Sequence, residues 1–277
     1  MLAHQSVQFA WSLDPLVCAL AFAALACFLQ GFVRLRRRRA SLAPWSRLVL
    51  FGAGVAVVLV GLVSPLDAIA EEYLQSAHML QHVLIADLGV ALALVAVRGP
   101  LAVFFLPPAL LVPLARSRTL RRGLSAVLRP RVVLPCWLLA VIVWHVPALY
   151  EAALARPTVH VLEHLSFVLA GSLVWTLIVD PARHLRLSLH GRIAVTALLF
   201  WTSQVLAYVT ALASAPLYGR YAEQPERLLG FSPLGDQRVA AVLMMVEQTL
   251  TVGVAFVLLV RASRARSRTQ AGAAVPA

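Results

Sequence analysis

The sequence has no lysine, few charged residues and three cysteines, and each scarcity narrows what the chain can be. Charged residues make up 13% of its 277 residues, hydrophobic residues make up 61%, and the mean hydropathy is +0.83. A soluble domain with this composition could not keep its apolar surface out of water, so the chain is expected in a lipid bilayer. The cysteines (Cys18, Cys27 and Cys136) lack Cys-x-x-Cys spacing and fall in apolar segments, which argues against a disulfide framework.

Recognisable catalytic signatures are also missing. The sequence shows no nucleophile with its base, no glycine-rich phosphate loop and no pair of catalytic carboxylates, so we predict that the protein is not an enzyme. The net charge of +12 could indicate a nucleic-acid partner. The arginines lie instead in separate loops beside apolar segments, which favours membrane lipid as the partner and predicts no nucleic-acid binding.

Long apolar runs are what the sequence has in abundance. Seven of them are long enough to cross about 30 Å of hydrocarbon as helices. They cover residues 15–33, 45–63, 76–97, 132–149, 159–179, 192–212 and 239–260. The predicted fold class is therefore all-α, a polytopic membrane helix bundle with seven transmembrane helices, in which residues 1–260 form a single domain.

The arginine distribution predicts the orientation of the bundle. Of the 24 arginines, 20 fall in the connections 34–47, 98–131 and 183–192 and in the tail after residue 260. These segments alternate along the chain so that all of them lie on one side, which the positive-inside rule identifies as cytoplasmic. We therefore expect the amino terminus outside and the carboxy terminus inside, in a multi-pass protein of the cytoplasmic (inner) membrane.

Two further segments on the predicted cytoplasmic side are not expected to cross the membrane. Residues 101–114 are apolar but short, contain three prolines and are flanked by arginines, so we predict an interfacial or re-entrant segment. Residues 261–277 are expected to form a disordered, arginine-rich cytoplasmic tail.

The candidate functional residues begin with two histidine pairs. His78 and His82 open the third apolar segment, and His160 and His164 open the fifth. Residues four apart share one face of a helix, so each pair can supply half of a metal site. In both segments a glycine follows seven residues after the second histidine, which makes a diverged internal repeat plausible.

His145 lies near the outer end of the fourth segment, so all five histidines are expected in one shallow layer on three helices. Ionisable residues at membrane depth are costly and usually functional. For His145 alone, a hydrogen-bonded core histidine is the ordinary reading. For the paired set, ligation of a metal or cofactor is favoured.

Methionines bear on the choice of metal. Imidazole suits copper, zinc and iron, and thioether sulfur adds a preference for Cu(I). The seventh segment carries Met244 where the fifth has His160, and Met79 lies inside the first histidine pair. Both are candidate ligands, although methionine commonly serves in core packing. The residues alone therefore leave copper, zinc and iron open, and ligation by a methionine would favour copper as Cu(I).

Carboxylates and an amide near these faces are candidates for orienting the ligands. Glu163 and Glu247 project near the ligand faces, and Gln248 occupies the position that corresponds to His164. Asp87 points about 180° away from His78 on an ideal helix, so we expect it to make a helix–helix contact.

Four motifs together resemble the membrane CtaG family of cytochrome c oxidase assembly factors, a seven-span family associated with caa-type haem-copper oxidases. They are Ser76-Ala77-His78-Met79-Leu80-Gln81-His82, Trp144-His145-Val146-Pro147-Ala148-Leu149-Tyr150-Glu151, Leu162-Glu163-His164-Leu165-Ser166-Phe167 and Ser232-Pro233-Leu234-Gly235-Asp236-Gln237, which leads to Met244. The resemblance extends from about residue 64 to residue 260.

The resemblance implies a metallochaperone of the respiratory chain, which assists cytochrome c oxidase assembly by supplying copper from the outer face. Its partners would be haem-copper oxidase subunits or accessory copper proteins on the outer side. The five outer histidines match the family's positions, and the last motif adds Asp236 and Gln237 to the residues expected around the ligands.

Three other functions fit the same residues. A membrane b-type haem-binding protein would use one histidine from each of two helices and leave the others without a ligand role. A metal or proton transporter would use Asp87, Glu163 and Glu247 as a relay. A structural assembly scaffold without metal would use the histidines only for hydrogen bonds.

Overall fold

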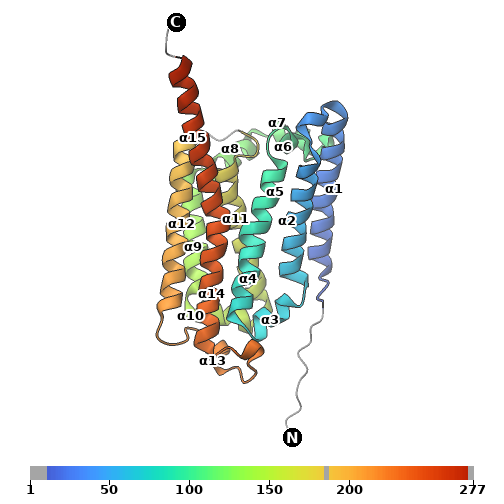
Figure 1. Cartoon of the computed structure of the whole chain (residues 1–277). Helices are drawn as coiled ribbons and strands as arrows, with labels where there is room; N and C mark the ends of the chain where they lie inside the picture. The colour runs from blue at the N-terminus through green and yellow to red at the C-terminus, as the bar shows by residue number, and fades with distance from the viewer. Residues whose placement is uncertain (1–10, 184–186, 274–277) are drawn as a thin grey trace.

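The fold is a bundle of long helices aligned along one axis (Figure 1), seen in a computed structural model that describes residues 11–183 and 187–273. The described residues contain no strand. The helices that run along this axis are α1 (Pro15–Arg38), α2 (Trp45–Val63), α4 (Gln75–Val83), α5 (Gly89–Val97), α9 (Pro130–His145), α11 (Pro157–Val179), α12 (Leu189–Leu212), α14 (Pro233–Gln248) and α15 (Val254–Ala273). Short π-helical segments, Leu84–Leu88 and Thr249–Gly253, join α4 to α5 and α14 to α15.

Short helices cover the two ends of the bundle. The end nearer the amino terminus carries α3 (Leu66–Glu72), α10 (Pro147–Ala155) and α13 (Gly219–Glu223). The opposite end carries α6 (Pro100–Phe104), α7 (Pro108–Arg116) and α8 (Arg118–Val127), and α15 leaves the bundle there (Figure 1). The segment 101–114 thus forms most of α6 and α7 at one end of the bundle, and its interfacial position remains a prediction.

Within residues 11–183 and 187–273, six helical runs are long and apolar enough to cross a membrane, which makes this a multi-pass membrane protein. A seventh span exists only if α8 and α9, which meet at 60°, are counted together. The predicted all-α membrane helix bundle is confirmed, whereas the number of seven spans and the orientation of the termini remain predictions. The sequence placed the fourth span at 132–149, whereas α9 ends at His145. Pro147 has no N–H to continue the helix and restricts the residue before it, so a new helix begins there.

The carboxy-terminal tail corrects a second expectation. We predicted disorder from residue 261, but α15 continues as a helix to Ala273, and its last described side chains are exposed. Arginine and alanine are good helix formers. Because the segment extends an existing helix, it needs no new nucleus. Residues 274–277 of the predicted tail lie outside the described part of the chain.

A close helix contact brings the two histidine-bearing helices together. A Cβ atom on Gly171 in α11 would lie 1.9 Å from the carbonyl oxygen of Ala86, in the π-helical segment after α4. Only glycine allows the two backbones to approach so closely. The carboxy-terminal continuation of α4 is therefore held directly against the middle of α11, and the histidines near the amino-terminal ends of both helices face the same space.

Candidate metal centre

The two histidine pairs meet face to face, as the sequence predicted. The ring centroids of His78 and His82 on α4 lie 4.3 Å apart, and those of His160 and His164 on α11 lie 4.1 Å apart. Between the helices, the centroids of His78 and His160 are separated by 5.4 Å and those of His82 and His164 by 5.3 Å. Four imidazoles from two helices therefore form one continuous cluster.

Glu163 lies inside this cluster rather than behind it. Its Oε2 is 3.7 Å from Nε2 of His78 and its Oε1 is 3.8 Å from Nε2 of His82, and the residue is fully buried. One ligand atom from each of His78, His82, His160 and Glu163 lies within 4.8 Å of all the others. We refer to these residues as the four-residue group. The sequence suggested that Glu163 orients a ligand, and the structure places its carboxylate among the candidate ligands themselves.

Neighbouring groups fix which nitrogen of His78 and His160 faces the four-residue group. Nδ1 of His160 is 2.5 Å from Oε1 of Glu71. The hydroxyl of Tyr221 donates to the carbonyl of Ala70 at 2.6 Å and lies 3.1 Å from Nδ1 of His78. Because the only proton of Tyr221 is used, its oxygen accepts from His78. Both rings therefore direct an unprotonated Nε2 towards the group, the arrangement that metal-binding histidines adopt.

Glu71 and Tyr221 were not identified from the sequence. A signal was present for Glu71, since it stands seven residues before His78 in the short connection that precedes the first histidine pair, and ligating histidines often have a carboxylate partner. The hydrogen bond from His160 lowers the pKa of the Glu71 carboxyl, because it stabilises the carboxylate. The side chain of Glu71 is 39% exposed, so this outer partner connects the cluster to the surface.

Several polar atoms of the cluster are buried without a hydrogen-bond partner. Among the described residues they include Nε2 of His78, His145, His160 and His164, both ring nitrogens of His82 and both carboxylate oxygens of Glu163. An unsatisfied buried polar group costs about 1–3 kcal/mol, and folded proteins keep few of them. A bound cation would satisfy the nitrogen lone pairs and the carboxylate together, so the residues present fit a metal ion.

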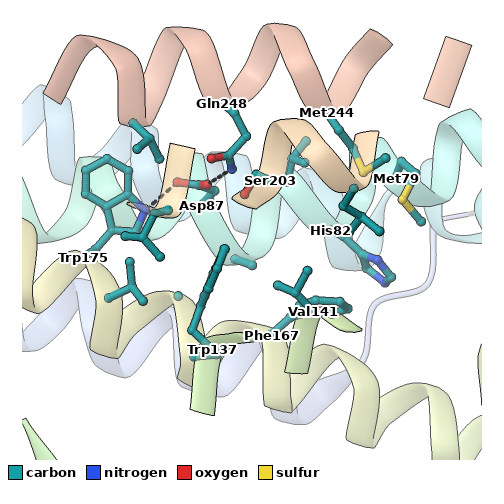
Figure 2. Close-up of a pocket in the computed structure, with 18 of the residues that line it drawn as sticks. Met79, His82, Asp87, Trp137, Val141, Phe167, Trp175, Ser203, Met244 and Gln248 are labelled. Carbon is teal, nitrogen blue, oxygen red and sulfur yellow. Dashed lines mark hydrogen bonds between the residues drawn. The ribbon is translucent and has the colours of Figure 1, made fainter. Parts of the chain in front are cut away.

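His145 and His164 lie beside the four-residue group but outside it. Nδ1 of His145, at the end of α9, is 2.7 Å from the carbonyl oxygen of Val141. His145 lines a cavity together with His82, Met79 and Met244. Figure 2 shows the last three of these residues. His164 is half-buried and packs against the rings of His82 and His160.

Asp236 and Gln237 hold the surrounding elements in place. The carboxylate of Asp236 accepts from the backbone N–H groups of Gln75 at 2.7 Å and Ser76 at 3.2 Å, so it caps the first turn of α4. Gln237 accepts from the N–H of Leu217 at 2.7 Å and donates to the carbonyl of Thr210 at 3.0 Å. Both residues act on the helices and loops around the site, and Asp236 fixes the helix end that carries His78.

A second polar group lies deeper in the bundle. Asp87 accepts from Nε1 of Trp175 at 2.5 Å and from Nε2 of Gln248 at 2.6 Å, which confirms the predicted helix–helix contact. Nε2 of Gln248 is also 3.2 Å from Glu247. The hydrogen bonds of Gln248 thus run to acidic side chains and away from the histidines (Figure 2).

Tyr150 of α10 and Tyr218, the residue before α13, cover one side of the site. Tyr150 stacks on Tyr218 with ring centroids 3.8 Å apart and lies 5.0 Å from the ring of His78. The hydroxyl of Tyr218 donates to the carbonyl of His145 at 3.2 Å, and Glu151 accepts from the N–H of Gly219 at 2.6 Å. α10 and the start of α13 therefore cover the histidine layer with packed, largely apolar side chains at the end of the bundle that carries α3, α10 and α13.

The comparison with known proteins agrees with the motifs and the site. The model of the family described as "Cytochrome c oxidase caa3 assembly factor (Caa3_CtaG)" matches residues 26–265. No curated protein and no solved structure is significantly similar to the chain. The matched range spans most of the sequence. It contains the four-residue group, its hydrogen-bond partners Glu71 and Tyr221, and Asp87 with the residues that donate to it. The chain therefore belongs to the family of caa3 cytochrome c oxidase assembly factors.

Proposed function

We propose that this protein binds a copper ion at the four-residue group and supplies it to a haem-copper oxidase during assembly. The observation that carries the proposal is the convergence of ligand atoms from His78, His82, His160 and Glu163 within 4.8 Å of one another. The family membership supports the oxidase as the destination. The protein acts as a metallochaperone without catalytic chemistry, and the ion is its cargo.

The spacing of the group is close to what a first-row metal needs. With metal–nitrogen and metal–oxygen distances of about 2.0–2.1 Å, neighbouring ligand atoms of a tetrahedral site are about 3.4 Å apart. The separations from Glu163 to His78 and to His82 are 3.7 and 3.8 Å. Small side-chain rotations would bring these atoms to ligand distance, so the group is nearly preorganised.

The identity of the cargo follows from the donors and from the family together. Three imidazoles and a carboxylate suit copper and zinc alike. Assembly of a haem-copper oxidase requires copper, which favours copper here, and we infer that it is handled as Cu(I). The arginine distribution predicts that the site faces outward. The acceptor is then an oxidase subunit or an accessory copper protein on the outer side of the cytoplasmic membrane.

Glu71 is expected to tune the affinity through His160. Changing Glu71 to glutamine removes the charged acceptor of the His160 N–H, and loss of such an outer partner lowers metal affinity about 10- to 100-fold. The neighbouring change Glu72→Gln is the matched control, because Glu72 is exposed and lies outside the group. Competitive metal titration of the purified chains measures both. Equal metal affinities for the two variants would show that Glu71 does not contribute to metal binding.

The direct test is metal analysis of the full chain purified in detergent. We expect the unchanged protein to retain copper and the double variant His78→Asn, His160→Asn to lose the equivalent that the four-residue group holds. His190→Asn is the control, because this exposed histidine lies on α12 at the far end of the bundle. In cells, the double variant should lower the copper content of the oxidase. A chain that binds no copper, with an oxidase that keeps its copper, would instead support the scaffold function.

The packing of the rings disfavours haem at this site. A bis-histidine haem with one ligand from each helix needs a flat slot between its two axial rings. The ring centroids of His78 and His160 are only 5.4 Å apart, and those of His82 and His164 only 5.3 Å. We expect no Soret band in the absorption spectrum of the purified protein. A Soret band that is lost with the double variant would overturn the copper proposal.

A further inference from the structure

A cavity of about 90 Å³ lies next to the four-residue group, between α4, α9, α11, α12 and α14. Figure 2 shows the sulfur atoms of Met79 and Met244 at one end of it, near the ring of His82, and Asp87 with Gln248 at the other end. Val141 and His145, one helical turn apart, also line the cavity, and His145 is close enough to His82 for the two rings to interact electrostatically. The end of this cavity near His82 is therefore lined by the thioethers of Met79 and Met244 and by the imidazoles of His82 and His145.

His145 presents a free nitrogen lone pair at this end. Its Nδ1 donates to the carbonyl oxygen of Val141 at 2.7 Å, so the neutral ring leaves Nε2 unprotonated. This Nε2 is buried and has no hydrogen-bond partner among the described residues. The walls around it are mostly apolar, with Val83, Phe167 and Leu206 among them. His145 is not a member of the four-residue group, so a metal ion bound there would leave this nitrogen without a partner.

His82 takes part in both the four-residue group and the cavity. It is a member of the four-residue group, and it also lines the cavity. Among the described residues, neither of its ring nitrogens has a hydrogen-bond partner, in contrast to His78 and His160, whose Nδ1 atoms are hydrogen-bonded to Tyr221 and Glu71. A neutral imidazole has one lone pair, so this ring can ligate an ion at the group through Nε2 or, as the other tautomer, an ion in the cavity through Nδ1, but not both at once.

We propose that the cavity is a second cation position, with Met79, Met244, His145 and His82 as its ligands. Thioether and imidazole donors without a carboxylate select a soft cation of low charge, the class to which Cu(I) and Ag(I) belong. The four-residue group has the harder donor set because it contains Glu163. An ion can then pass between the two positions by ligand exchange at His82, with no change of oxidation state.

This inference extends the proposed function and rests on it for its role in copper delivery, but its ligands can be tested separately. The probe is Ag(I), titrated into the full chain in detergent, with Cu(I) in parallel. We expect the double variant Met79→Leu, Met244→Leu to lose one equivalent of bound Ag(I), and the X-ray absorption spectrum of bound Cu(I) to lose its sulfur scatterers. Leucine has nearly the volume of methionine, so packing should be preserved.

Matched variants separate the two positions and control for folding. Met245→Leu changes the adjacent methionine, which does not line the cavity, and should leave both readouts unchanged. His78→Asn with His160→Asn should remove the equivalent at the four-residue group and keep the sulfur signal. If the double methionine variant unfolds, His145→Asn replaces it and should lose the same equivalent. An unaltered Ag(I) count and unaltered sulfur scattering in the folded methionine variant would overturn the second position, whatever the four-residue group does.

Discussion

Replacing Gly171 by alanine is expected to lower the free energy of unfolding by about 3 kcal/mol, the upper part of the range for overpacking a close contact. The added Cβ would lie 1.9 Å from the carbonyl oxygen of Ala86 and 2.9 Å from its carbonyl carbon. Both atoms belong to backbone, so no side chain can turn away to make room. The helices themselves would have to separate.

Separating these helices should also change the geometry of the metal centre. Gly171 lies on α11, which carries His160 and Glu163, and Ala86 lies in the segment that continues α4. Moving α11 away from α4 widens the distances from Glu163 to the histidines of α4, which are already 3.7 and 3.8 Å. We therefore expect metal affinity to fall more than about tenfold, since outer-shell disturbances of this kind cost 10- to 100-fold. Thermal unfolding in detergent and metal titration measure the two effects.

Gly52→Ala is the matched control for this change. Gly52 is also in a transmembrane helix, but a Cβ there would meet nothing within 4 Å. Alanine is the better helix former, so this variant should be neutral or more stable by up to about 1 kcal/mol. If Gly171→Ala and Gly52→Ala unfold at the same temperature, α11 and the π-helical segment are not in the contact described.

The features that the sequence predicted well are the local ones. Apolar runs of about 20 residues mark spans because helix length and bilayer thickness are fixed by geometry, and residues 45–63 coincide with α2. The i, i+4 spacing places both histidines of a pair on one face whatever the tertiary structure. The glycines of the two repeats, Gly89 and Gly171, also proved informative, because both stand at close helix contacts.

The features that the sequence did not predict depend on contacts between distant segments. Glu71 and Tyr221 reach the histidines from two different connections, and only the packing of α3 against α13 and the bundle brings them there. The position of Glu163 between His78 and His82 depends on the rotation of α11 relative to α4. The π-helical segment after α4 changes the helical register there, which an ideal period of 3.6 residues does not represent.

Removing the carboxylate of Asp87 should also be strongly destabilising. In the Asp87→Ala variant, Nε1 of Trp175 and Nε2 of Gln248 lose their charged acceptor in the interior of the bundle. Hydrogen bonds to charged groups contribute about 1.5–3 kcal/mol each, so the free energy of unfolding should fall by about 3 kcal/mol or more. Asp87→Asn keeps one carbonyl acceptor for two donors and should lie between this variant and the unchanged protein. Denaturant titration in detergent measures the series.

Measurements of metal binding and of metal flux distinguish this structural role of Asp87 from a role in transport. Asp87 joins the segment after α4 to α11 and α14 through Trp175 and Gln248, and it is not a member of the four-residue group. Folded Asp87→Asn protein should therefore keep its copper and its metal affinity. A transporter that used Asp87 as a relay would behave in the opposite way, with metal-dependent flux in sealed vesicles that the asparagine variant abolishes at unchanged stability. Since both donors to Asp87 come from neighbouring helices, we expect the loss of helix attachment and no such flux.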